Sequence, residues 1–258
     1  MTGQFLPRSA TITIKTMDKR KTGEIPETKK RFLLLQLNDA FFPVGLYAHS
    51  YGLETYIQKE AVKDESSAYE FICNMLLYGI GRNEALAMRL SYQAVQSPGS
   101  DQEKLLRLFR LDELVRISRT PEEIRNAGEK TGSRFLKTVA AFTGLPEHSL
   151  FRQYAEESRG QSHAVAYGVY CAVCGIAESD ALEHFLYAQA SFMVTNCVKT
   201  IPLSQMKGQK ILAACTDGMD SVIRAIENYT EEDFGAETPG FEIRSMQHEA
   251  LYSRLYMS

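Results

Sequence analysis

Hydrophobic residues recur every three or four positions along this chain, from about residue 31 to its end. Residues 105–117 place leucines, a phenylalanine and a valine along one helical face, and residues 124–142 repeat the pattern. A period of about 3.6 residues is typical of amphipathic helices that bury one side. No two alternating runs are joined by a tight glycine turn, so nothing in the pattern favours a sheet. We therefore expect an all-α fold.

Local signals predict where several of these helices begin. The segment from Thr120 to Glu123 is typical of a capped start, with Thr120 as the cap, Pro121 in the first turn and Glu123 reaching back. Three further positions predict helix starts: Asp180, Ser204 and Thr230. Gly79 and Gly81 interrupt the periodic run 69–95, which predicts a kink or a break.

Residues 185–198 are apolar nearly all round, which predicts a central helix surrounded by others. The run is shorter than the ~20 residues of a membrane span and contains polar residues, so it indicates a buried core helix and no membrane contact. No linker divides residues 31–258. We expect a single compact domain of roughly ten helices there, preceded by a basic, disordered extension over residues 1–30. A weak strand-like alternation at 11–16 lies within that extension.

Charge is concentrated at the N-terminal end of the chain. Residues 1–31 carry eight lysines and arginines against three acids, while the whole chain has a net charge of −3. A basic end can indicate nucleic-acid binding. Because no aromatic residues interleave with these charges, a solvated extension that binds no nucleic acid is favoured.

Cysteine usage and motifs narrow the class of protein. Five cysteines, an odd number, in a chain without a secretory signal indicate a reduced, cytoplasmic protein. The phosphate-loop, dinucleotide and Gly-x-Ser-x-Gly motifs do not occur, and His248-Glu249 lacks the second histidine of a zinc-protease motif. These absences argue against an enzyme.

Two cysteine positions have spacings or neighbours that suggest chemistry. Cys171 and Cys174 are spaced like a metal or redox pair, but their apolar helical stretch favours two core residues. Lys199 beside Cys197 can lower a thiol pKa, although a buried structural cysteine is favoured. The five histidines predict no metal site within one chain, and a site shared between the chains of a dimer stays open.

The segment from Tyr47 to Glu54 follows the turn Pro43-Val44-Gly45. Ser50, or else His49, is the expected cap of a helix in which Glu54 lies near the positive end of the dipole. The rings of Tyr47, His49 and Tyr51 look exposed in this reading. Such clusters are common at interfaces, and interface and internal packing both remain open.

The last thirteen residues, 246–258, hold two tyrosines, two leucines and two methionines with a single acid. That composition is too apolar for a solvated tail, so the segment must pack on its own chain or on another. Arg254 lies between Tyr252 and Tyr256, where a guanidinium can stack or bind a carboxylate. A docked role is favoured over a surface arginine on a frayed end.

Three segments of this chain, 35–54, 196–209 and the C-terminal thirteen residues, resemble urease accessory proteins of the UreF family. Shorter matches at 119–125, 132–136 and 163–168 follow in the family's order. The resemblance implies an all-α, cytoplasmic, non-enzymatic protein that forms a homodimer and binds the accessory protein UreD (UreH in some bacteria). It also implies recruitment of the GTPase UreG to the urease apoprotein for GTP-dependent nickel insertion. The chain itself would hold no tightly bound cofactor, because nickel is handled by the complex.

Carried over position by position, the resemblance implies thirteen partner-binding residues: Tyr47, His49, Ser50, Tyr51, Gly52, Glu54, Tyr187, Cys197, Lys199, His248, Glu249, Tyr252 and Arg254. We hypothesise that Arg254 pins the tail beside Tyr47 and Tyr187 and so forms a surface for UreG. One alternative is a nickel carrier whose metal site is shared across a homodimer through His49, Cys197 or His248. Another is a small-molecule hydrolase built on His248-Glu249.

Overall fold

The computed structural model describes residues 25–45, 49–146, 149–158, 160–236 and 239–256. Within these ranges the chain forms helices and no strand, which confirms the all-α prediction. The α-helices are α1 (Glu27–Leu37), α2 (Leu53–Gln58), α3 (Glu65–Asn74), α4 (Leu86–Gln96), α5 (Asp101–Ile117), α6 (Glu122–Phe142), α7 (Leu150–Glu157), α8 (His163–Val173), α9 (Glu178–Thr200), α10 (Gln205–Asp217), α11 (Met219–Asn228) and α12 (Pro239–His248). Among them, none combines the length and the apolar character that a membrane span requires.

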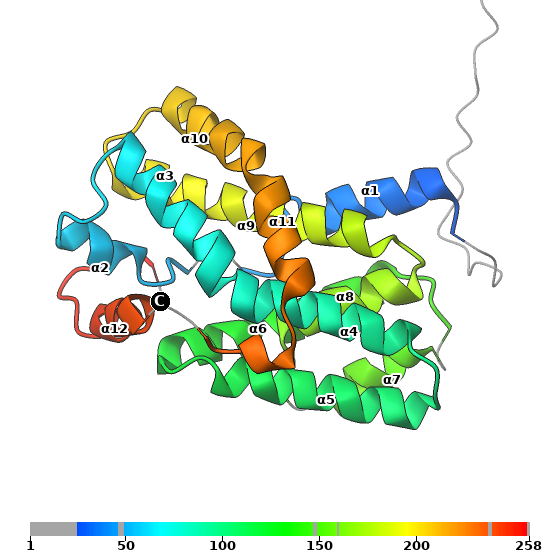
Figure 1. The fold of residues 1–258 in the computed structure, drawn as a ribbon. Helices are drawn as coiled ribbons and strands as arrows, with labels where there is room; N and C mark the ends of the chain where they lie inside the picture. The colour runs from blue at the N-terminus through cyan, green and yellow to red at the C-terminus, as the bar shows by residue number, and fades with distance from the viewer. Residues whose placement is uncertain (1–24, 46–48, 147–148, 159, 237–238, 257–258) are drawn as a thin grey trace, which may run out of the picture.

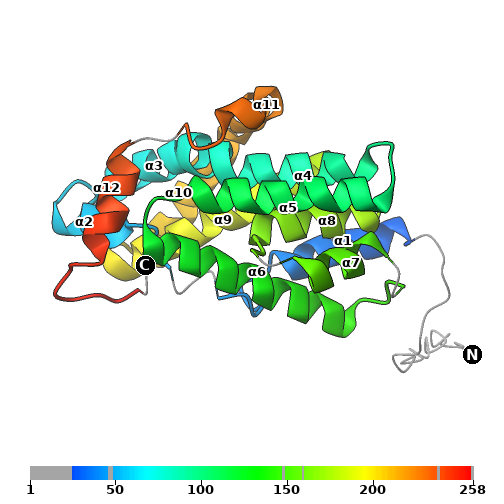
Figure 2. The same ribbon diagram turned by 90° about the horizontal axis from the view of Figure 1, so that it is seen from below.

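Helix α9 runs through the centre of the molecule and packs against helices on several sides (Figure 1). It buries residues around most of its circumference, including Phe185, Gln189 and Cys197. Helices α3, α10 and α11 cover one side of it in Figure 1, while α5 and α6 lie in front of α8 and α9 in Figure 2. The central helix predicted at 185–198 is therefore confirmed, and it is longer than predicted.

Helices α4 and α8 share an extensive interface, and Gly168 allows their backbones to come close. A Cβ atom at Gly168 would collide with the carbonyl oxygen of Met88 and the hydroxyl of Ser91. Without a side chain there, the two helices approach to backbone contact, which extends the dispersion contacts along both of them.

The run from Tyr69 to Val95 bends without breaking. Two π-helical segments, Met75–Gly79 and Gly81–Ala85, connect α3 to α4. The kink predicted from Gly79 and Gly81 is thus present as widened helical turns, which are a frequent cause of helix bending.

Helix starts follow the sequence only in part. Ser204 caps α10 as predicted, accepting a hydrogen bond from Lys207 N at 3.3 Å. Helix α9 begins at Glu178, two residues before Asp180. Thr230 caps only the 3-10 turn Glu231–Asp233, in which Asp233 accepts a hydrogen bond from the Thr230 amide at 2.8 Å.

At the N-terminal side, α1 begins at Glu27, slightly before the domain boundary predicted at residue 31. The strand-like segment 11–16 lies outside the described residues. At the opposite end of the molecule, α12 packs on α2 and α6 beside the C-terminus, as both ribbon views show. This end positions most of the residues singled out in the sequence.

Candidate functional site

The C-terminal residues fold back onto α2 and α6 through a buried histidine. His248, the last residue of α12, is fully buried. Its Nε2 lies 2.9 Å from Oε2 of Glu54, and its Nδ1 lies 2.9 Å from Oε2 of Glu123. Both ring nitrogens therefore lie within hydrogen-bonding distance of carboxylates, one on α2 and one on α6.

The same two carboxylates hold residues 249–256, which we call the tail. Oε1 of Glu54 accepts a hydrogen bond from the backbone N–H of Leu255 at 2.7 Å, and Oε2 accepts one from Tyr256 at 3.1 Å. Arg254 Nη1 donates to Oε1 of Glu123 at 2.6 Å. Glu54, Glu123, His248 and Arg254 thus form one connected network, the tail anchor, which joins α2, α6, α12 and the tail.

The anchor explains why α6 does not start as the sequence predicts. Glu123 was expected to reach back to its own helix cap, yet its carboxylate is used by His248 and Arg254. Helix α6 begins at Glu122 without a side-chain cap, and Glu242 of α12 accepts from the Thr120 amide at 2.9 Å instead. A contact between distant helices has replaced the local capping box.

A left-handed backbone at the start of α2 allows α12 to approach. Tyr51 and Gly52 have φ values of 52° and 78°. A Cβ atom at Gly52 would come within 2.8 Å of the Ser245 hydroxyl on α12. The expected cap at Ser50 is therefore wrong: Gly52 occupies the cap position without a side-chain bond, and Ser50 is buried before it.

The rings expected to be exposed near this turn are largely buried. His49 is buried, and its carbonyl accepts a hydrogen bond from Asn196 of α9 at 2.9 Å. Burial, with Arg134 and Lys130 nearby, lowers the pKa of His49 to about 4 despite the opposing charge of Glu123. Burial raises the pKa of Tyr51, and Glu84 adds to the effect. Packing within the chain accounts for both rings, and Tyr47 lies outside the described residues.

The three candidates on α9 occupy different environments. Cys197 is fully buried, and burial raises its pKa to about 12, so the structural reading of this cysteine holds. Lys199 is exposed on the last turn. Tyr187 is half-exposed and lines a groove of about 920 Å³ with Leu35 of α1 and Ile223 of α11.

The structure does not bring Arg254 and Tyr187 together as hypothesised. Arg254 pairs with Glu123 at the α2–α12 end, whereas Tyr187 lines the groove beside α1 and α11. Within the tail region, Glu249 is exposed and Tyr252 is fully exposed. The anchor therefore unites Glu54, His248 and Arg254 from the predicted set, and adds Glu123.

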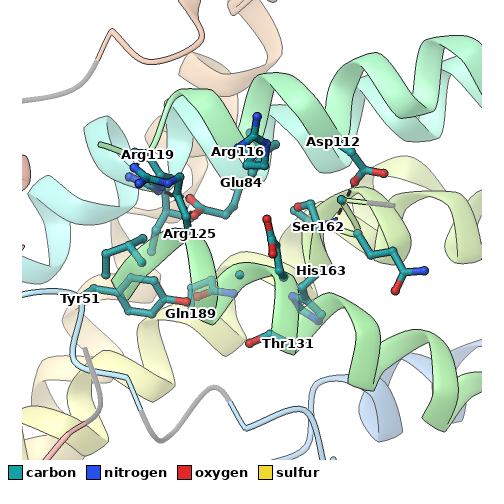
Figure 3. A pocket seen from close by; sticks show the side chains of 18 residues that line it. Tyr51, Glu84, Asp112, Arg116, Arg119, Arg125, Thr131, Ser162, His163 and Gln189 are labelled. Carbon is teal, nitrogen blue, oxygen red and sulfur yellow. Dashed lines mark hydrogen bonds and ion pairs between the residues drawn. The ribbon is translucent and has the colours of Figure 1, made fainter. Parts of the chain in front are cut away.

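A small cavity of about 50 Å³ lies beside Tyr51, and both apolar and charged side chains line it (Figure 3). Tyr51 and Gln189 line it on one side, and Arg119, which is buried and ion-paired with Glu84, lines it on another. Asp112 of α5 reaches its far end, as Figure 3 shows.

Asp112 is a buried carboxylate that the sequence reading missed. It accepts hydrogen bonds from the hydroxyls of Tyr154 and Ser158, at 2.9 Å and 2.8 Å, and from the Ser162 amide at 2.8 Å. Burial nevertheless raises its pKa to about 7, because the three donors offset only part of the desolvation. The sequence did contain a signal for this residue: an acidic side chain among the hydrophobic residues of the helix predicted at 105–117 indicates a buried carboxylate.

In the part of the chain that the structure describes, the cysteines and histidines do not form a metal site. No three His, Cys, Asp or Glu side chains there are grouped so that they could hold a metal ion. Cys171 and Cys174 are buried thiols of the core, as the apolar stretch predicted. The buried His248, with both nitrogens bonded, offers no open general base beside Glu249.

Comparison with known proteins agrees with the resemblance. The family model described as UreF matches residues 62–216. The "Urease accessory protein UreF" of Actinobacillus pleuropneumoniae serotype 5b (strain L20) is 35% identical over 229 residues, covering 87% of this chain and 97% of that protein. Proteins of the same name from Arthrobacter sp. (strain FB24) and Bacillus sp. (strain TB-90) are 30% and 31% identical, and the alignments cover 87% of this chain and 96% and 97% of theirs. The chain therefore belongs to the UreF family, whose members are urease accessory proteins and not enzymes, as the sequence predicted.

Proposed function

We propose that this chain is a cytoplasmic chaperone that bridges the accessory protein UreD (UreH) and the GTPase UreG on the urease apoprotein. In this role it supports GTP-dependent insertion of nickel into the urease active site. Nickel would be handled by the assembled complex, and this chain would hold no tightly bound cofactor. Membership of the UreF family supports the general task.

The tail anchor is the observation that carries the adaptor role. A chain end usually frays, but here two carboxylates hold it through Leu255 N, Tyr256 N and Arg254. The anchored backbone leaves Tyr252 and Leu255 with their side chains exposed. Apolar and aromatic side chains on a fixed backbone bind a partner at low entropic cost, which favours a protein–protein contact.

A homodimer is part of the same proposal. Leu35 and Tyr187, both exposed, line the groove between α1, α9 and α11. Phe32 and Phe41 are also exposed at or near α1. Exposed apolar side chains gathered in this way favour association, and a second copy is the partner that the family resemblance implies.

The nickel content of urease tests the proposal most directly. Urease would be purified from cells that express the urease subunits and the other accessory proteins, with and without this chain, at equal expression and ample nickel. We expect nickel-poor urease without the chain and restored nickel on re-expression. Equal nickel in both preparations would overturn the proposed role.

A further inference from the structure

The small cavity beside Tyr51 is lined by side chains from several elements. Gln189 of α9, Thr131 of α6 and His163 of α8 line one side of it, and Arg119 lines the other (Figure 3). Its volume of about 50 Å³ gives room for a molecule of about four non-hydrogen atoms, since one water-sized group needs ~10–15 Å³. None of these residues belongs to the tail anchor.

His163, the first residue of α8, brings an unpartnered ring nitrogen to this cavity. Its Nε2 atom is buried and has no hydrogen-bond partner among the described residues. The ring is held in place because it stacks on Phe185, with a centroid distance of 5.9 Å, and meets Phe135 edge-on at 5.0 Å. Burial lowers the pKa of His163 to about 4, so the ring is neutral at physiological pH. A buried polar atom without a partner is costly, which points to a bound group that completes its hydrogen bond.

The charges around the cavity balance, and most of them already have partners. Three arginines and three acids line it: Arg116, Arg119, Arg125, Glu84, Asp112 and Glu129. Arg119 pairs with Glu84, and Arg116 makes two hydrogen bonds with Glu113, at 2.7 Å and 2.8 Å. Arg125 donates to two backbone carbonyls. An ion that entered the cavity would lose its hydration without gaining a free opposite charge, so the wall favours an uncharged ligand.

The uncharged polar groups of the wall can both donate and accept hydrogen bonds. The amide of Gln189 offers an N–H and a C=O, and the hydroxyl of Tyr51 can play either part. We propose that this cavity is a binding site for a small uncharged amide, the class to which urea belongs, which hydrogen-bonds to Gln189 and to Nε2 of His163. A primary amide suits these partners because it also presents an N–H and a C=O side by side. Such binding does not depend on the adaptor role proposed above.

A ligand in this cavity would act on the helix that leads into the tail. Arg119 places its guanidinium 5.4 Å from the ring centre of Phe241 on α12. Tyr51 directly precedes Gly52, which packs against Ser245 of the same helix. Two parts of the cavity wall are thus attached to α12, so an occupied cavity would stabilise the packing of that helix.

Saturation-transfer NMR on the full-length chain tests the site with three probes of one shape. Acetamide, acetate and acetamidinium each carry a methyl group on a planar centre, but at neutral pH they are uncharged, negative and positive. We expect a saturable signal from the acetamide methyl group with a Kd on the order of 1 mM, because so small a ligand can make few contacts. Urea should displace acetamide, and the two ions should bind at least about tenfold more weakly. A lack of saturable acetamide binding, a failure of urea to compete, or binding of either ion as tight as that of acetamide would overturn the inference.

Substitutions that each remove one polar group locate the bound probe. His163→Phe keeps an aromatic ring but removes Nε2, and Gln189→Leu removes the amide, so each should weaken acetamide binding by about tenfold or more. His184→Phe is the matched control, because His184 lines the separate groove beside Tyr187 and should leave binding unchanged. Circular dichroism identifies a variant that fails to fold, and the probe series on the wild-type chain needs neither variant. Wild-type affinity in folded His163→Phe and Gln189→Leu would place acetamide elsewhere and overturn the inference.

Discussion

Asp112 shows how much one buried side chain can contribute to the pH dependence of this molecule. Its pKa is about 7 in the folded chain, against about 4 in an unfolded one, a difference worth on the order of 4 kcal/mol. A raised carboxyl pKa means that the folded state binds the proton more tightly. Its contribution is therefore full below pH ~4 and is lost as the pH rises through ~7. Asp112→Asn removes this titration, so urea unfolding should show the variant gaining stability relative to wild type between pH 5 and pH 8.

Glu113 provides the matched control, because it lies one position further along α5 but is exposed. A hydrogen bond from Arg116 lowers the pKa of Glu113, so this group stays ionised throughout the same pH range. The difference between Glu113→Gln and wild type should be flat from pH 5 to pH 8. A flat difference for Asp112→Asn as well would show that Asp112 is ionised throughout and that its three donors outweigh burial.

At the scale of elements, the approach of α12 to α2 depends on Gly52. Its φ of 78° and its contact with Ser245 leave no room for a Cβ atom. Gly52→Ala should lower the free energy of unfolding by about 1–3 kcal/mol, through left-handed strain and the clash together. Thermal and urea unfolding would measure the loss.

Gly128→Ala is the control for Gly52→Ala, since it adds the same methyl group inside α6, where a Cβ atom meets nothing within 4 Å. Alanine favours a helix interior over glycine, so this variant should be neutral or up to about 1 kcal/mol more stable. If the two glycine variants had equal stability, the close packing of α12 on α2 would not depend on Gly52.

Elements with a local cause could be predicted from the sequence, and contacts between distant residues could not. The periodic runs 105–117 and 124–142 form α5 and α6. They were predictable because a helix that buries one face has hydrophobic residues every three or four positions, a pattern contained in a short stretch of sequence. The tail anchor joins Glu54 to His248 across 194 positions and Glu123 to His248 across 125. In the sequence, Glu123 fits a local capping box as well as it fits a long-range contact. Only the fold shows that its carboxylate binds His248 and Arg254 instead of its own helix cap.

Across the whole molecule, the tail anchor connects two of the segments whose sequence resembles the UreF family, residues 35–54 and the last thirteen residues. If the tail forms part of the surface for UreG, releasing it should weaken recruitment without unfolding the helices. Arg254→Ala removes the ion pair with Glu123, which is partly exposed and contributes on the order of 1 kcal/mol or less to folding. We expect an unchanged helical circular dichroism spectrum and a several-fold loss of UreG in a pull-down with UreD present.

Two further variants separate anchoring from direct contact. Arg110→Ala removes an exposed arginine that pairs with Glu231, outside the tail anchor, so it should leave UreG recruitment intact. Tyr252→Ala leaves the anchor in place but removes an exposed ring, so a loss equal to that of Arg254→Ala would assign the contact to the outer face of the tail. If Arg254→Ala and Tyr252→Ala both recruit UreG as well as wild type does, the contacts of Glu54 and Glu123 with the tail would stabilise the fold without forming the surface for UreG. The surface for UreG would then have to be sought on another face, with the groove beside Tyr187 as the next to substitute.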